Sequence, residues 1–266
     1  MVKGSFKTEL LGVPPRGALK LWQEAYYRIR ERILRGDFPL GSPLNRRKLA
    51  EELRMSLLPI SEALRRLELD GLVEAEERAG TRVKIPTAQE IEDHITVRAA
   101  LECESARLFC QRATDAERED ILARAEQLDS LRAHSGDLSL DKQVSYAVHS
   151  YHLNFHSRIA EGARCQGLLR LIEQNQVLTL NWLYDTASES KSLPANFHAD
   201  LARAVTGNDS DEAARAMRSH VWHGWERLAR EFKAKYWNDD FTSEQAGTAE
   251  PARRWRTTAG QRDRET

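Results

Sequence analysis

Four histidines in the C-terminal half of the sequence have the chemistry of metal ligands, and two of them have a spacing that suits one site. His152 and His156 lie four residues apart, a spacing at which side chains project from one helix face, so both imidazoles can reach one point. Imidazole nitrogens bind zinc, nickel, copper and ferrous iron. His198 and His220 follow on two later segments, each beside apolar residues of a helical stripe. A neutral imidazole in such a place needs a partner.

A second interpretation stays open, in which each of these histidines is an ordinary interior or surface residue with a hydrogen-bonding partner. That interpretation is favoured for a single histidine, but four on such faces would be an unusual way to build a core. His149, one turn earlier, could orient a ligand, and His223 could compete with His220. We assign no role to His94 or His134.

The N-terminal elements have the order of a winged helix-turn-helix. A helical pattern runs from Leu19 to Gly36, and a segment crowded with Gly and Pro follows as a turn. A short helix over 45–53 is expected next, and then a helix from Ser56, its N-cap, to Asp70. Apolar residues on both sides of Gly80 predict a two-stranded hairpin. Helix, short helix, helix and hairpin make up this fold.

The remainder of the chain predicts helices alone. Thr87 with Glu90 and Thr114 with Glu117 are capping boxes that begin two long helices. Further helices are expected over 141–162, 166–187, 194–206 and 209–236. The fold class is therefore mainly α, an N-terminal winged helix-turn-helix followed by an all-α helical bundle. We predict a flexible arm over 1–18, the winged helix domain over 19–86, the helical domain over 87–236 and a disordered tail over 237–266.

Composition restricts the function class more than it identifies it. A net charge of −1 says nothing in favour of nucleic acid, and no stretch approaches the ~18–20 apolar residues of a membrane span. Three cysteines without C-x-x-C spacing argue against a disulfide framework, so we expect a cytoplasmic protein without a membrane partner. The metalloprotease motif needs a glutamate directly after the first histidine, whereas leucine follows His152. We expect no enzyme.

Residues 20–85 resemble the DNA-binding domain of the GntR regulators. The resemblance lies in the run LNRRKLAEELRMSLLPISEALRRLELDGLV and in the wing Arg78–Val83. It implies contact with double-stranded operator DNA, and Arg47 matches an arginine that contacts DNA in the family. Leu57 and Ser61 stand where the family usually has arginines; a leucine offers only apolar contact, for example with a thymine methyl group. We assign to DNA contact Arg46, Arg47, Lys48, Ser56, Leu57, Ser61, Arg65 and Arg82.

The helical domain resembles the FadR-type C-terminal ligand-binding domain, often called FCD. Arg98 and Glu102 match an Arg-x-x-x-Glu pattern of that domain and are assigned to effector binding. The resemblance implies one divalent metal held by His152, His156, His198 and His220. The family pattern has aspartate at the position of His152, and an all-nitrogen set favours zinc or nickel. Cys165, where the family often has asparagine, is a stray ligand or a packed small residue.

The resemblance implies a homodimeric regulator, usually a repressor, controlled by a small organic acid. The carboxylate of that effector would be held by the metal and by Arg98. The alternative is a winged helix protein that acts mainly through protein contacts and has a structural metal or no metal. Leu57 and Ser61 replace the arginines that usually read the bases in this family. The base sequence of the operator therefore cannot be inferred from other family members.

Overall fold

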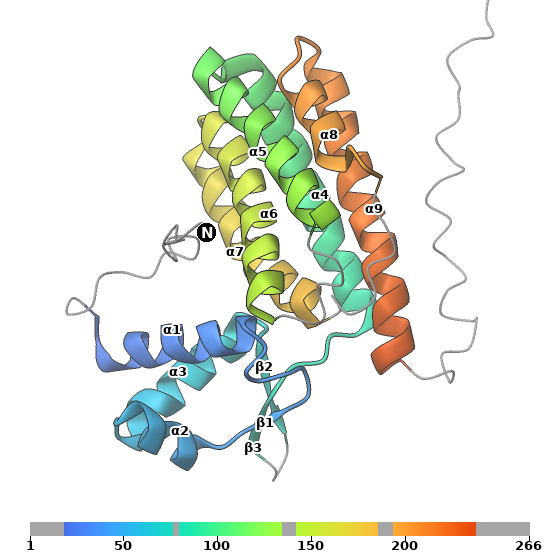
Figure 1. Ribbon diagram of the computed structural model, residues 1–266. Helices are drawn as coiled ribbons and strands as arrows, with labels where there is room; N and C mark the ends of the chain where they lie inside the picture. The colour runs from blue at the N-terminus through green and yellow to red at the C-terminus, as the bar shows by residue number, and fades with distance from the viewer. Residues whose placement is uncertain (1–18, 77–79, 135–141, 186–193, 238–266) are drawn as a thin grey trace, which may run out of the picture.

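The computed structural model describes residues 19–76, 80–134, 142–185 and 194–237. It has a winged helix part, with three helices and a small sheet, and a bundle formed by the later helices (Figure 1). The mainly α fold predicted from the sequence is confirmed. The elements are α1 (Leu21–Leu34), β1 (Pro43–Leu44), α2 (Arg46–Leu53), α3 (Leu57–Leu69), β2 (Val73–Glu76), β3 (Gly80–Val83), α4 (Ala88–Arg112), α5 (Asp115–His134), α6 (Lys142–Gly162), α7 (Gln166–Asp185), α8 (Phe197–Val205) and α9 (Ser210–Tyr236).

The two helices of the helix-turn-helix begin in different ways. Asn45 caps α2, because its Oδ1 accepts hydrogen bonds from the backbone N–H groups of Arg47 and Lys48 at 2.9 and 3.1 Å. Ser56 is the N-cap residue of α3, as predicted, although its hydroxyl makes no capping hydrogen bond. An N-cap serine accepts a hydrogen bond from the backbone N–H of the second or third helical residue. Pro59 is the third helical residue and has no N–H, so one of these two donors is missing.

The wing is a three-stranded antiparallel sheet in the order β1-β3-β2. Val73 pairs with Val83 and Glu76 with Gly80, which confirms the predicted hairpin. The sequence analysis missed β1, whose Leu44 pairs with Thr81. A strand of two residues inside a segment rich in Gly and Pro has no alternating pattern, and it therefore reads as part of a turn.

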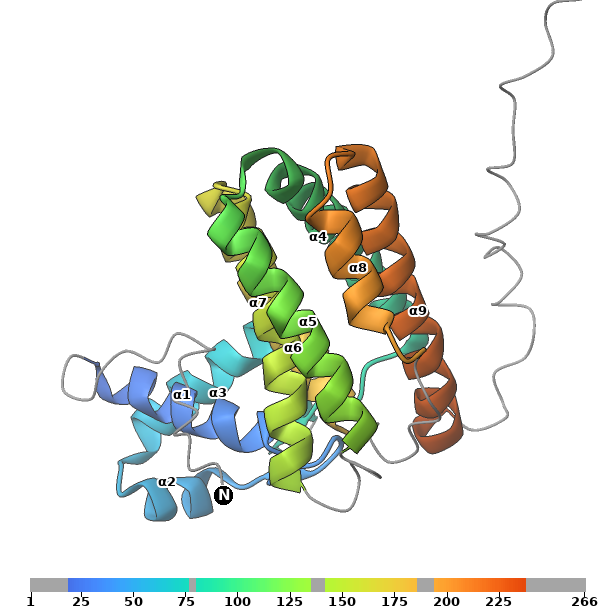
Figure 2. The same ribbon diagram turned by 45° about the horizontal axis from the view of Figure 1, so that its top comes forward.

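The bundle is organised around α4. This helix packs along α9 and also contacts α6, α7 and α8, while α5 packs against α6 and α8. Figure 2 shows α5, α6 and α7 on one side of the bundle and α8 with α9 on the other. Both predicted capping boxes are present, since Glu90 bonds back to Thr87 and Glu117 to Thr114. The core is apolar, with Phe109, Phe155 and Phe232 fully buried.

The winged helix contacts the bundle at several points. Gly71, with φ +76°, follows α3, and Leu178 of α7 lies directly against it. The guanidinium of Arg35 stands 5.3 Å from the ring centroid of Tyr146 on α6. Trp237, directly after α9, donates from Nε1 to the carbonyl oxygen of Pro86 at 3.2 Å. These contacts connect the winged helix to α6, to α7 and to the end of α9, and α6 and α9 carry histidines of the predicted metal site.

Two predicted segments lie largely outside the described residues: the arm over 1–18 and, after Trp237, the tail. Within the described ranges, no helix combines the length and apolar character that crossing a membrane requires.

Candidate metal centre and DNA-contacting surface

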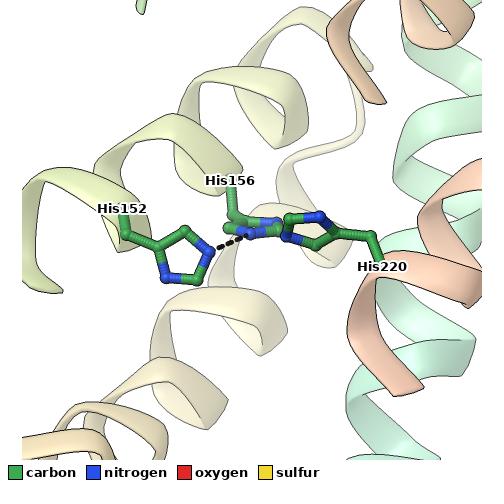
Figure 3. Close-up of side chains that lie close together, drawn as sticks. All are labelled: His152, His156 and His220. Atoms are coloured by element: carbon green, nitrogen blue, oxygen red, sulfur yellow. Dashed lines mark hydrogen bonds between the residues drawn. The ribbon is translucent and has the colours of Figure 1, made fainter. Parts of the chain in front are cut away.

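Three of the four predicted ligands come together in the interior of the bundle. His152 and His156 project from α6, and His220 reaches them from α9 (Figure 3). One nitrogen of each imidazole can be chosen so that all three lie within 4.8 Å of one another. All three side chains are buried. Two helices that are distant in sequence thus bring three donors to one point.

The donor set fits a divalent metal. The Nε2 atoms of His152 and His156 lie 3.0 Å apart. Nitrogens bound at about 2.1 Å to one ion lie about 3.0 Å apart at a right angle and about 3.4 Å apart at the tetrahedral angle. Nδ1 of His152 and Nδ1 of His220 are buried without a hydrogen-bonding partner, an arrangement that is rare for polar atoms unless a ligand completes it.

His198, the fourth predicted ligand, borders this group from α8. Its ring centroid lies 5.2 Å from that of His152 and 5.3 Å from that of His220. Asp129 of α5 fixes its orientation, since Oδ1 of the carboxylate lies 2.5 Å from Nδ1 of the imidazole. The other ring nitrogen of His198, Nε2, is buried without a partner. The aspartate therefore leaves His198 one nitrogen with which to bind a metal.

Glu102 joins the predicted effector residues to the histidines. Its Oε1 accepts from Nε of Arg98 at 2.8 Å, and its Oε2 lies 2.7 Å from Nδ1 of His156. Burial alone would raise the pKa of Glu102, but the charge of Arg98 and the contact with His156 outweigh it and lower the pKa to about 2. Nη2 of Arg98 is buried without a hydrogen-bonding partner. A guanidinium nitrogen in that state can still bind an anion.

The surroundings of His152, His198 and His220 favour the neutral imidazole, which is the form that binds metals. Burial lowers the pKa of His152 and of His220 well below the ordinary value for histidine, and the neighbouring imidazoles add to the shift. Burial also lowers the pKa of His198 to about 4, although Asp129 opposes it. These imidazoles are neutral at neutral pH, and a metal ion binds the neutral imidazole.

The remaining histidines and Cys165 lie outside the group of three. His149 is buried on α6 one turn before His152, whereas His223 is exposed and packs its ring against Phe197. His94, on α4, bonds Thr179 at 2.9 Å. Cys165 is half-buried just before α7. The side chain of His134 is outside the described residues.

The predicted DNA-contacting residues lie on α2, on α3 and in the wing. Leu57 is 50% exposed at the start of α3, and Ser61 is half-buried one turn later. Arg46, Arg47 and Arg65 are exposed and form no ion pair within the described part of the chain. Ser56, the N-cap, is exposed as well.

Two of the predicted cations are engaged within the protein. Lys48 lies 3.9 Å from Glu52. Arg82 contacts Glu74 at 2.7 Å and Glu76 at 3.3 Å. Binding a phosphate with Arg82 therefore requires the guanidinium to leave two carboxylates. Of the predicted DNA-contacting arginines, those without an ion pair in the described residues are all on the helix-turn-helix.

Sequence reasoning missed two features of these sites. Asp129 was not selected because it lies mid-helix in a segment rich in charge, 69 positions before His198. Only the contact between α5 and α8 brings the two together. Leu58, 71% exposed beside Leu57, was also overlooked, although two successive leucines at the start of the predicted helix were visible in the sequence.

Comparison with protein families assigns both parts of the chain. Residues 21–83 match the family described as "Bacterial regulatory proteins, gntR family", and residues 93–223 match the FCD domain. The first range covers α1 to β3, and the second contains all four predicted metal ligands.

Curated relatives are similar over most of the chain. A transcriptional repressor of Escherichia coli K12, GlaR, is 28% identical over 204 residues, which are 74% of this chain and 91% of that protein. The Nta operon transcriptional regulator of Aminobacter aminovorans is 26% identical, over 72% of this chain and 86% of that protein. A probable repressor of a D-xylose utilization operon in Paenarthrobacter nicotinovorans is 27% identical, over 71% and 80%.

Solved structures share the fold. McbR/YncC of E. coli superposes with a TM-score of 0.61 at 18% identity, covering 80% of this chain and 99% of that one. A putative GntR regulator from Rhodococcus sp. RHA1 gives a TM-score of 0.62 at 19% identity, covering 81% and 98%. At these identities the likeness concerns the arrangement of helices and strands.

Proposed function

The chain belongs to the GntR family of bacterial regulatory proteins, with an FCD domain behind its winged helix, and on that premise we propose that it is a metal-dependent repressor released from its operator by a small organic acid. It is a DNA-binding transcription regulator and not an enzyme, as the sequence predicts. The proposal adds a metal, an effector and a dimeric state to that assignment.

One observation carries the metal and the effector together. The histidine group has buried ring nitrogens without partners, and Arg98 beside it has a buried Nη2 without a partner. We assign the metal to His152, His156, His198 and His220, with zinc or nickel as the ion. When bound, the ion supplies a Lewis acid that attracts a carboxylate. Arg98 would bind the second oxygen of that carboxylate or another acidic group of the effector.

The coordination number decides whether an effector can reach the ion. The two Nε2 atoms on α6 lie 3.0 Å apart, close enough for both to bind one ion. Four protein ligands in a five- or six-coordinate site leave one or two positions for water or a carboxylate. A closed tetrahedral site would instead be structural.

Packing between the domains offers a route from this site to the DNA. Gln176 of α7 accepts a hydrogen bond from Ser157, the neighbour of His156, at 2.9 Å. Two residues further along α7, Leu178 lies against Gly71 at the end of α3. A ligand that shifts α6 against α7 would therefore press on the exit of the recognition helix. Such control requires the effector to bind one arrangement better than the other.

We propose that the protein binds operator DNA as a homodimer. A single α3 reads too few base pairs to be specific, and two of them would lie in successive major grooves about 34–36 Å apart or a multiple of that distance. The operator would then be a pseudo-palindrome. A monomer in light scattering that binds one half-site would contradict this part.

The deciding experiment measures metal content, melting temperature and operator binding of the same preparation. We expect about one zinc or nickel per chain, and a carboxylic acid that raises the melting temperature only of the metal-loaded protein. An acid at about 100 times its Kd adds roughly 2.7 kcal/mol of stability to the state it binds. The same acid should weaken operator binding.

Two other outcomes would replace the proposal. A metal whose removal lowers stability, with no acid that depends on it, would make the site structural. Protein that contains no metal and ignores added zinc would leave the histidines as interior residues, and acid-insensitive DNA binding would then favour control through protein contacts.

A further inference from the structure

The first turn of α3 presents two large apolar side chains to solvent. Leu57 is 50% exposed and Leu58 is 71% exposed, while Ile60, Ala63 and Leu64 of the same helix are buried. One exposed leucine is ordinary on a protein surface. Two in succession matter here because of their position.

That position is the part of a helix-turn-helix that reaches the bases. The second helix lies in the major groove, and its N-terminal residues contact the base edges. An aliphatic side chain neither donates nor accepts a hydrogen bond, so it recognises one feature of the major groove, the C5-methyl group of thymine. The leucines are therefore suited to thymine and unsuited to guanine.

The charges around the leucines favour DNA over an apolar protein partner. Arg46, Arg47 and Arg65 are exposed on α2 and α3 without ion pairs in the described residues, so the surface would meet a polyanion. Glu62 is exposed on the second turn of α3. Its carboxylate would be repelled by phosphates but can accept a hydrogen bond from cytosine N4, so it is compatible with a turn that faces bases.

We propose that Leu57 and Leu58 read thymine methyl groups, so that each operator half-site carries T·A pairs beneath the first turn of α3. The inference rests on the proposed function, in which α3 enters the major groove. An arginine at the position of Leu57 would favour guanine in the operator. The inference states that thymine takes the place of that guanine.

The test removes single methyl groups from the DNA. An operator is first selected from a library of random duplexes with the full-length protein. Each thymine of the half-site is then replaced in turn by uracil, which lacks only the C5-methyl group. Burying one methyl-sized group changes an equilibrium about fourfold, so one or two positions per half-site should show a loss of about that size.

Variants then assign those positions to the leucines. A variant that lacks one leucine, Leu57→Ala or Leu58→Ala, should bind two duplexes equally well: the one with thymine and the one with uracil at the position which that leucine contacts. Leu69→Ala is the matched control, because Leu69 is 67% exposed at the opposite end of α3. It should keep the full difference between the two duplexes.

Three results would overturn the inference. Specific binding that no uracil weakens, or a uracil effect that persists in both leucine variants, would exclude thymine reading and leave the repressor proposal intact. Failure to select any duplex would instead remove the operator binding on which both proposals rest.

Discussion

The histidine group and the first turn of α3 both depart from the usual rule that apolar side chains are buried and polar ones exposed. The bundle buries imidazoles, a carboxylate and a guanidinium, whereas α3 exposes two leucines. The buried groups are held by partners such as Glu102 and Asp129. Leu57 and Leu58 instead leave half or more of their surface to solvent.

This difference determines how strongly each region should respond to substitution. Removing one member of a buried, hydrogen-bonded set leaves its partner desolvated and unpaired, which costs several kcal/mol. Removing an exposed side chain affects only what it contacts in a complex. We therefore expect large effects on metal binding and stability in the bundle, and smaller effects, confined to DNA, on α3.

The largest expected effect follows removal of one metal ligand. His220→Ala should lower the metal content of purified protein from about one ion per chain to nearly none, because His220 is the proposed ligand from α9. Elemental analysis after dialysis measures it. His223→Ala, an exposed histidine three residues later, is the control and should retain the metal. Equal metal content in both variants would break the assignment of His220.

The buried ion pair gives the next effect. Glu102→Gln should lower the free energy of unfolding by roughly 3–5 kcal/mol, because it leaves the buried charge of Arg98 uncompensated. Glu104→Gln removes the exposed pair with Arg107 on the same helix and should cost less than about 1 kcal/mol. Denaturant unfolding with chelator present measures both. If both variants lost a similar amount of unfolding free energy, burial of the ion pair would not be what determines the loss.

The pH dependence of that loss has a defined sign. Glu102 has a pKa of about 2 in the folded protein, below the value of about 4.3 for an unfolded glutamate. Its stabilising effect is therefore complete above about pH 4.3 and declines as the pH falls towards 2. The gap in unfolding free energy between the wild type and Glu102→Gln should narrow over that interval.

A third effect should follow from loss of the carboxylate that orients His198. Asp129→Asn keeps an oxygen for the backbone N–H groups at the start of α8, but it replaces the charge beside Nδ1. Metal affinity should fall about 10–100-fold, as is typical when an outer partner of a ligand is lost. Asp120→Asn, which breaks ion pairs with Arg124 and Arg158 at the surface, should leave the affinity unchanged. Competition with a chromophoric chelator distinguishes them.

Local sequence signals predicted most of the fold. Capping boxes at Thr87 and Thr114 and the glycine after α3 determine where helices begin and end through contacts within a few residues. The missed strand has an equally physical origin. The strand β1 depends on pairing with β3, which no pattern within its two residues reveals.

The metal site was predictable in part. The pair on α6 follows from helical spacing alone, and His198 and His220 were placed by resemblance. Which carboxylate supports which histidine depends on how α4, α5 and α8 pack, and no short-range pattern contains that information. Glu102 was selected, but as an effector residue; its contact with His156 is visible only in three dimensions.

The smallest effect in this series compares two arginines of the helix-turn-helix. Arg47→Ala should weaken operator binding by about 1–3 kcal/mol and relax sequence preference. Arg47 is exposed and has no ion pair in the described residues. Because Leu57 and Ser61 lack guanidinium groups, it is also the main arginine left to read a base. Arg66 is engaged by Asp70 at 3.3 Å, so Arg66→Ala should change affinity little. If it does contact a phosphate, operator and random DNA should weaken alike, and the salt slope should fall by about one unit. Titrations of both variants against operator and random duplexes at several salt concentrations separate these cases. An unchanged ratio of operator to random binding in Arg47→Ala would show that base reading lies elsewhere on the surface.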